Sequence, residues 1–399
     1  MNHVIERPLG GPILTRSTLA VLVLAGLGLG FVAVRLFTGL GPVTAMSDAY
    51  AWGIWKPLNV VTFTGIGAGA LALSLVTYVA NRGRYHALVR SAVLVGAIAY
   101  TLAGFSVVVD LGRWWNVWAL FVPPWWNLDS VLLEVALCVM AYCAVLWIEV
   151  FPAVLERWAE RDGALSRIAV LLRPWVRRGF PFVVAVAIVL PFMHQSSLGS
   201  LFLVTQTKLH PLWHTAWLPA LFLLSCLSMG AGAVIVIDTI THLAWRRDRD
   251  VSLDSMLALV MAGFSFAFLA LRLGDVLAAG ELPWVHGPKG LLFLVESGLF
   301  LYPAVRVLAP SYRRNPGYLF WAAQLTVAAG ALYRFDTYLA AFDPGRNFAY
   351  FPSLGEILFS SGLAAIGVAI YVVAVKRLPV LAGVPEARPL PPHRRARAA

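Results

Sequence analysis

Charged residues are scarce in this chain. Only 13% of its 399 residues are Asp, Glu, Lys or Arg, whereas 60% are hydrophobic and the mean hydropathy is +0.77. A soluble domain cannot bury that much apolar surface, because too few polar side chains remain to cover it. The composition therefore excludes a water-soluble protein and predicts one that crosses the bilayer many times.

Cysteines are also few. Cys138, Cys143 and Cys226 lie in apolar stretches and form no CxxC, CxxCH or ferredoxin-type spacing. We interpret them as small core residues rather than disulfides or iron–sulfur ligands. The N-terminal stretch is too long and polar for a removable signal peptide and has no small-residue cleavage site, so the first apolar segment is predicted to be retained.

Positive charge is in excess, with 31 Lys and Arg against 20 Asp and Glu. These charges lie in short runs between apolar segments rather than on one face of a folded domain. We therefore predict no nucleic-acid partner.

Apolar segments of about the twenty residues that cross the hydrocarbon recur along the chain. Loops rich in Gly, Pro, Asn and Arg separate them. We predict an all-α, polytopic membrane bundle of about ten transmembrane helices over residues 1–380, and a basic, disordered tail over residues 381–399. The ten predicted spans are 17–38, 53–80, 87–111, 129–151, 180–203, 213–244, 254–278, 290–309, 317–341 and 354–377.

The orientation follows from the loops. With ten spans, both termini share one side of the bilayer with four loops, and that side carries 23 of the 31 basic residues. The other eight are Arg35, Lys56, Arg113, Lys208, Arg272, Lys289, Arg334 and Arg346. Since Lys and Arg accumulate on the cytoplasmic side, both termini are predicted to be cytoplasmic.

Ionisable residues within these spans gather in the outer half of the bilayer, where each is costly and therefore a functional candidate. Asp110 and Arg113 end the third span, and Arg272 and Asp275 end the seventh. Each pair is three residues apart and shares a helix face, so either a packed ion pair or direct contact with a ligand is compatible with it.

Glu134 in the fourth span and His194 in the fifth have no same-helix partner of opposite charge. His194 lies in the run PFMHQSSLGS, where Ser197, three residues on, shares its helix face. We predict that His194 and Ser197 line a cavity, while Gln195 and Ser196 contact neighbouring helices.

A membrane-soluble molecule that exchanges protons at this depth explains the outer cluster. A quinone needs an apolar slot and, at its two oxygens, groups such as His and Glu or Asp that transfer protons. A bis-histidine haem needs two facing imidazoles; His194 and His214 are the one pair whose predicted depth allows it, and we expect no haem. Nearer the cytoplasm, Glu149 and Asp238 are candidates for a proton path.

The motifs resemble the NrfD/PsrC superfamily of polysulfide-reductase-type membrane subunits. Within it they are most similar to the ten-helix branch represented by HybB, the membrane subunit of a respiratory nickel–iron hydrogenase. The matching motifs run from about residue 8 to about residue 381 and include DAYAWGIWKPLNVVTFTGIGAGA, VVDLGRWWN, NLDSVLLEVALCV, PFMHQSSLGSLFL, LRLGD and FDPGRNFAYFPSLGEIL.

This resemblance implies a haem-free site for menaquinone or ubiquinone near the periplasmic face of a bacterial inner membrane. The partners that it implies are a periplasmic ferredoxin-like subunit that holds the [4Fe-4S] clusters and a catalytic subunit, a nickel–iron hydrogenase or another oxidoreductase. Residues of the matching motifs expected to bind the quinone are His194, Ser197, Glu134, Asp110, Arg113, Asn59, Trp55, Arg272 and Asp275. Of these, His194, Glu134 and Asp110 are expected to be catalytic.

Asn59 departs from the pattern, since hydrogenase-type members often have an acidic residue there. A membrane subunit of a complex that acts on sulfur compounds is therefore an alternative to the hydrogenase assignment. A purely structural membrane anchor and a proton-conducting channel are alternatives of another class. Either direction of electron flow fits the sequence, and proton translocation is a further possibility.

Overall fold

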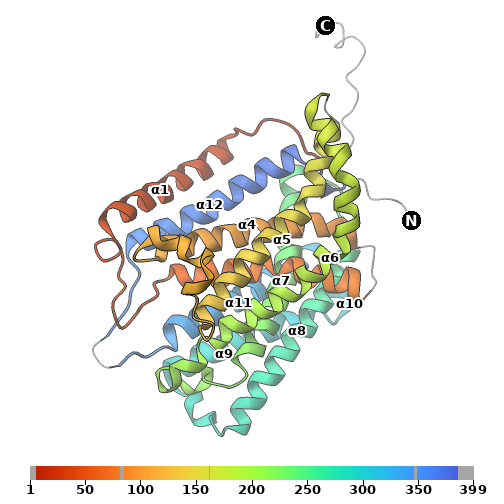
Figure 1. Cartoon of the computed structure of the whole chain (residues 1–399). Coiled ribbons are helices and arrows are strands. Elements are labelled where there is room, and N and C mark those ends of the chain that lie inside the picture. Colours follow the sequence, from red (N-terminus) through yellow and green to blue (C-terminus); the bar gives the residue numbers. More distant parts are fainter. Residues whose placement is uncertain (1–5, 81–84, 161, 346–347, 385–399) are drawn as a thin grey trace.

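The computed structural model describes residues 6–80, 85–160, 162–345 and 348–384. Its long helices pack side by side in one bundle (Figure 1). They are α1 (Arg16–Thr38), α4 (His86–Asp110), α5 (Val131–Ala159), α6 (Ala164–Ser200), α7 (Leu218–Trp245), α8 (Val251–Ala278), α9 (Gly287–Arg306), α11 (Pro316–Phe335) and α12 (Leu354–Arg377), with a short α10 (Pro310–Arg313) between α9 and α11. The all-α class is confirmed.

Eight helical segments of the described chain are long and apolar enough to cross a membrane. Helices α9 and α11 lie where two further spans were predicted, and each has 20 residues, but they are not among those eight. The protein is therefore a multi-pass membrane protein, while the count of ten spans and the cytoplasmic termini stay predictions.

The second predicted span is interrupted rather than continuous. It consists of a π-helical turn (Lys56–Thr62), α2 (Phe63–Gly67), α3 (Gly69–Ser74) and a second π-helical turn (Leu75–Val79). Most of it is buried in the centre of the bundle. A Cβ added at Gly69 would lie 2.8 Å from the carbonyl oxygen of Gly230, so glycine allows this span to touch the backbone of α7.

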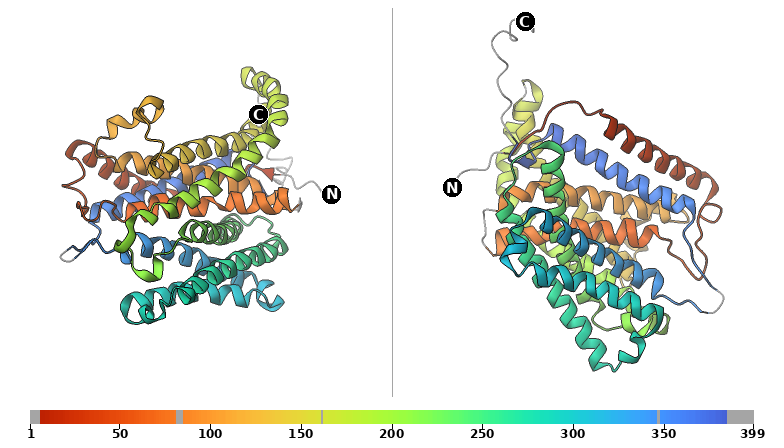
Figure 2. Two further views of the ribbon diagram at one scale, coloured as in Figure 1. Left: turned by 60° about the horizontal axis from the view of Figure 1, so that its bottom comes forward. Right: turned by 180° about the vertical axis from the view of Figure 1, so that it is seen from behind.

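Helix α6 begins about four turns before the predicted span, at Ala164 instead of residue 180. It forms an antiparallel hairpin with α5, and this hairpin extends past the rest of the bundle (Figures 1 and 2). Hydrophobicity marks only the part of a helix that can lie in hydrocarbon, which is why the polar extension was missed.

The two chain ends meet at the same end of the bundle. Strand β1 (Glu6–Arg7) pairs antiparallel with β2 (Leu381–Ala382). Leu381 and Ala382 are buried, so the predicted tail boundary at residue 381 is wrong and the packed fold continues through these residues. The rest of the predicted disordered tail, residues 385–399, lies outside the described residues.

Candidate functional site

The second span, α4, α5 and α6 bring several predicted site residues together toward one end of the bundle. Lys56, at the start of the second span, forms an ion pair with Asp110 at the end of α4. One turn deeper, the amide of Asn59 donates a hydrogen bond to the hydroxyl of Ser106 over 3.2 Å. These contacts attach the π-helical turn to α4. The amide oxygen of Asn59, Oδ1, has no hydrogen-bond partner among the described residues.

Glu134 and Ser197 form the second contact of this site. The Ser197 hydroxyl, which is buried, lies 2.6 Å from Glu134 Oε1 and donates to it. Glu134 is in the first turn of α5, where the helix dipole favours a negative charge. Its side chain reaches the bundle surface, so Ser197 stands between an exposed carboxylate and the interior.

His194 lies on the same face of α6 as Ser197 and is fully buried. Its ring packs edge-on against Tyr100 at 5.5 Å, and Tyr100 packs against Tyr142 at 4.6 Å. Neither ring nitrogen of His194 has a hydrogen-bond partner among the described residues. Gln195 faces a neighbouring helix as predicted, since its amide donates to Thr64 over 3.2 Å.

Three predicted positions lie elsewhere. Ser196 hydrogen-bonds to carbonyls of its own helix, so the predicted contact with a neighbouring helix is wrong. Trp55 packs against Phe31 of α1 at 6.4 Å and Phe359 of α12 at 5.4 Å. Arg113 is exposed in the turn after α4. The structure does not bring Trp55 or Arg113 to His194.

The interpretation of two same-helix ion pairs is wrong. Asp110 pairs with Lys56, and Arg272 pairs with Glu296 of α9, which is fully buried. The side chain of Asp275 forms no hydrogen bond or ion pair with any residue that the structure describes. Aromatic rings surround the guanidinium of Arg272 at 4.3–5.6 Å, and cation–π attraction stabilises it there. These rings belong to Trp213, Phe268, Phe293 and Tyr333.

Arg334 is a buried charge that the predicted site did not include. Its guanidinium donates to the carbonyl of Gly330 at 2.8 Å and to Ser225 at 3.4 Å, and no described carboxylate pairs with it. It lies close enough to His194 for their charges to interact. An arginine within an apolar span was the available signal, because such a residue is expensive in hydrocarbon.

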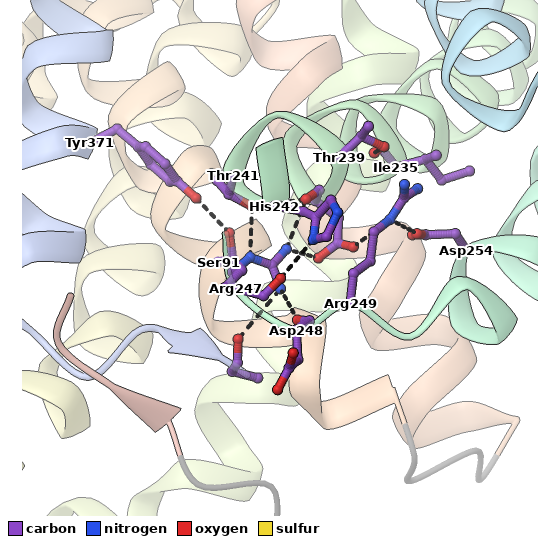
Figure 3. A network of polar contacts seen from close by, with 12 residues as sticks. Ser91, Ile235, Thr239, Thr241, His242, Arg247, Asp248, Arg249, Asp254 and Tyr371 are labelled. Atoms are coloured by element: carbon purple, nitrogen blue, oxygen red, sulfur yellow. Dashed lines mark hydrogen bonds and ion pairs between the residues drawn. The ribbon is translucent and has the colours of Figure 1, made fainter. Parts of the chain in front are cut away.

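At the opposite end of the bundle is a cavity of about 1320 Å³, which we call the inner-end cavity. Glu149 and Asp238, the predicted proton-path residues, both line it. Asp238 is held by ion pairs with Arg247 and Arg249. Figure 3 shows these two arginines in their network of polar contacts. The role of Asp238 in a proton path stays a prediction, as does that of Glu149.

Glu6 of β1 also lines this cavity, outside the membrane-spanning segments. Its carboxylate pairs with Arg90 at 3.0 Å, while Arg90 also holds Glu156 of α5 at 2.6 Å. Burial raises the pKa of Glu6 to about 7, because loss of water outweighs the attraction of Arg90.

Long apolar helices with ionisable side chains enclosed between them define the class: an integral membrane protein with a polar site inside its helix bundle. In the part of the chain that the structure describes, no three His, Cys, Asp or Glu side chains are grouped to hold a metal ion. The family model described as polysulphide reductase, NrfD, matches residues 42–341. The chain therefore belongs to the NrfD family, as the resemblance of its motifs predicted.

Three relatives span most of the chain. One from Escherichia coli K12, named "Probable Ni/Fe-hydrogenase 2 b-type cytochrome subunit", is 32% identical over 96% of both chains. The integral membrane subunit of a menaquinone reductase from Nitratidesulfovibrio vulgaris Hildenborough is 26% identical over 78% of this chain and 77% of its own. The integral membrane subunit of an Hdr-like menaquinol oxidoreductase from Archaeoglobus fulgidus is 24% identical over 90% of this chain and 92% of its own.

The E. coli relative is named as a b-type cytochrome subunit, and this name goes against the expectation that the subunit lacks haem. The two other names refer to menaquinone chemistry in membrane subunits, as the quinone prediction does.

Proposed function

We propose that this chain is the quinone-binding membrane subunit of a respiratory oxidoreductase in a bacterial inner membrane. In this role it passes electrons between iron–sulfur clusters of a periplasmic partner and the quinone pool. Relatives over most of its length are named as membrane subunits of a hydrogenase, a menaquinone reductase and a menaquinol oxidoreductase, which supports this assignment.

The observation that carries the proposal is the hydrogen bond from Ser197 to Glu134 beside the buried imidazole of His194. Buried polar atoms are almost always hydrogen-bonded, so two unpartnered ring nitrogens indicate that a water or a ligand oxygen completes this site. Asn59 Oδ1, also buried and unpartnered, adds an acceptor from the second span. These groups suit the two carbonyl oxygens and apolar ring of a quinone.

A quinone, when bound, supplies two oxygens that take up protons as two electrons arrive. His194 in its neutral form presents one N–H donor and one acceptor nitrogen, so it can bind an oxygen and exchange a proton with it. Ser197 can pass a proton between the interior and Glu134 because its hydroxyl both donates and accepts. Glu134, at the bundle surface, exchanges protons with water on the outer side.

The charges around this site hold it in place. Lys56 forms an ion pair with Asp110 at the outer rim, and Arg334 supplies a positive charge inside the bundle. That charge stabilises negative charge that develops on a ligand oxygen during reduction. Arg272 belongs to a separate aromatic cluster with Glu296, and we assign it a structural role.

A nickel–iron hydrogenase is the proposed catalytic partner, and a sulfur-compound oxidoreductase is the alternative because Asn59 is not acidic. The residues that were considered for a haem do not fit one. A bis-histidine haem needs two facing imidazoles, whereas His194 is enclosed against Tyr100 and His214 is exposed before α7. The two histidines considered for a haem therefore do not form a bis-histidine site in the described structure, and the absorption spectrum of the purified protein tests whether a haem is bound.

The test uses the complex purified with its partner subunits. Reduced methyl viologen delivers electrons to the partner, and reduction of a water-soluble quinone is followed. We expect Glu134→Gln and His194→Gln each to lower quinone reduction by about 10²-fold, the lower end of the effect of losing a general acid–base group. Re-oxidation of the viologen by the catalytic subunit's own substrate should stay unchanged.

His214→Gln and Glu281→Gln are matched controls, since both replace exposed or partly exposed residues outside the site. Unchanged quinone reduction in the Glu134 and His194 variants would favour a structural anchor. Proton flux through the chain reconstituted alone would favour a channel.

A further inference from the structure

The inner-end cavity combines arginines with an apolar wall. Its lining comes from α4, α5, α6, the loop before α8 and the two terminal strands. Its volume of about 1320 Å³ exceeds the roughly 300–1,000 Å³ of pockets that enclose drug-sized ligands. A ligand larger than water or a simple ion therefore fits.

Two arginines of this lining have no partner. Arg90, Arg247 and Arg249 each pair with a carboxylate, whereas Arg173 and Arg177 of α6 form no ion pair or hydrogen bond within the described parts of the chain. Both are exposed to the cavity, and they are one helical turn apart.

The face of α6 that carries them changes from basic to apolar along its length. Arg173, Val176, Arg177 and Phe180 all line the cavity, at the spacing of a single helix face. The predicted hydrocarbon span begins at residue 180, so the two arginines lie about 10 Å and about 5 Å outside it. The headgroup layer on each side of a bilayer is about 5–8 Å thick, so Arg177 lies within this layer and Arg173 lies just beyond it.

The rest of the cavity lining adds apolar side chains and carboxylates. Pro152, Leu155 and Ala159 of α5 face the lower part of α6 across it. Of the carboxylates in the lining, Glu6, Glu156 and Asp238 pair with arginines, which lessens their repulsion of an anion, whereas Glu149, Asp248 and Asp250 form no ion pair among the described residues. Because the other arginines of the lining are paired, Arg173 and Arg177 are the ones available to bind an anion.

We propose that the inner-end cavity binds an anionic phospholipid, with its phosphate on Arg173 and Arg177 and an acyl chain along Val176, Phe180 and the apolar wall of α5. Basic pockets between helices on the cytoplasmic side of a membrane bind such headgroups. The bound lipid joins the projecting α5–α6 hairpin to the rest of the bundle near the terminal strands. This role is independent of the quinone site.

The experiment measures lipid bound to the purified full-length chain in mild detergent. Phosphatidylglycerol and phosphatidylcholine are titrated separately, and retained lipid is quantified by mass spectrometry. We expect preferential retention of phosphatidylglycerol, and a fall in its affinity of about thirtyfold in the Arg173→Gln/Arg177→Gln variant, since each basic group contributes about fivefold. Arg178→Gln, next to these residues but outside the lining, should bind as the unsubstituted chain does.

Retention of phosphatidylcholine equal to that of phosphatidylglycerol would overturn the proposal, because phosphatidylcholine carries no net negative charge. So would unchanged affinity in a double variant whose melting temperature is preserved. Complete displacement by inorganic phosphate would assign the arginines to a free anion and refute a lipid site.

Discussion

Removing the carboxylate of Glu296 tests the interior of the bundle most directly. Glu296 is fully buried and Arg272, its partner, is 2% exposed. In Glu296→Ala the guanidinium stays inside without a counter-ion. Breaking a buried ion pair costs about 3–5 kcal/mol, and the four surrounding rings retain part of the stabilisation. We therefore expect a loss of about 3 kcal/mol.

The assay is denaturant unfolding of the purified chain in mixed micelles, followed by tryptophan fluorescence. Asp275→Ala is the matched control, because it lies one turn from Arg272 on α8 but forms no contact with it. We expect that variant to change stability by less than about 0.5 kcal/mol. Replacing both partners, in Arg272→Met/Glu296→Leu, should restore most of the loss, because no buried charge remains. Equal losses in Glu296→Ala and Asp275→Ala would refute the pairing.

Three further predictions concern other contacts. Gly362→Ala should destabilise the chain by about 1–3 kcal/mol, because the added Cβ would lie 2.5 Å from the Cα of Gly28. Gly26→Ala is the control, since its Cβ would meet no atom within 4 Å and should leave stability unchanged. Thermal unfolding measures both. Asp250→Ala should cost about 1 kcal/mol in the same measurement, because its side chain caps α8. The raised pKa of Glu6 means that its burial favours the protonated form, so its contribution to stability falls as pH rises from about 4.5 to about 7. The melting temperature should therefore decrease less between pH 5 and pH 8 in Glu6→Gln than in the unsubstituted chain. An equal decrease in the two proteins would contradict this assignment.

The sequence predicted a candidate site, and the structure adds contacts among its residues. The spacing of His194 and Ser197 places them on one helix face, and the structure adds Glu134 as the partner of Ser197. The sequence could not identify the partners of Asp110 and Arg272. Both have an oppositely charged residue three positions away, yet each pairs with a residue of another segment. Glu296 lies inside the bundle, where an unpaired charge is most costly, and Lys56 lies at the start of the second span beside the end of α4.

Hydrophobicity and the positions of polar residues determined the fold class and the approximate helical segments, and the motifs indicated the family. These properties follow from local composition, since a helix in lipid must bury its own backbone polar groups whatever surrounds it. Only the tertiary structure decided the interruption of the second span, the separation of Arg272 from His194, the enclosure of Arg334 and the inner-end cavity. Each depends on which helices are neighbours, and contacts between residues as far apart as Lys56 and Asp110 are not encoded in the spacing of either one.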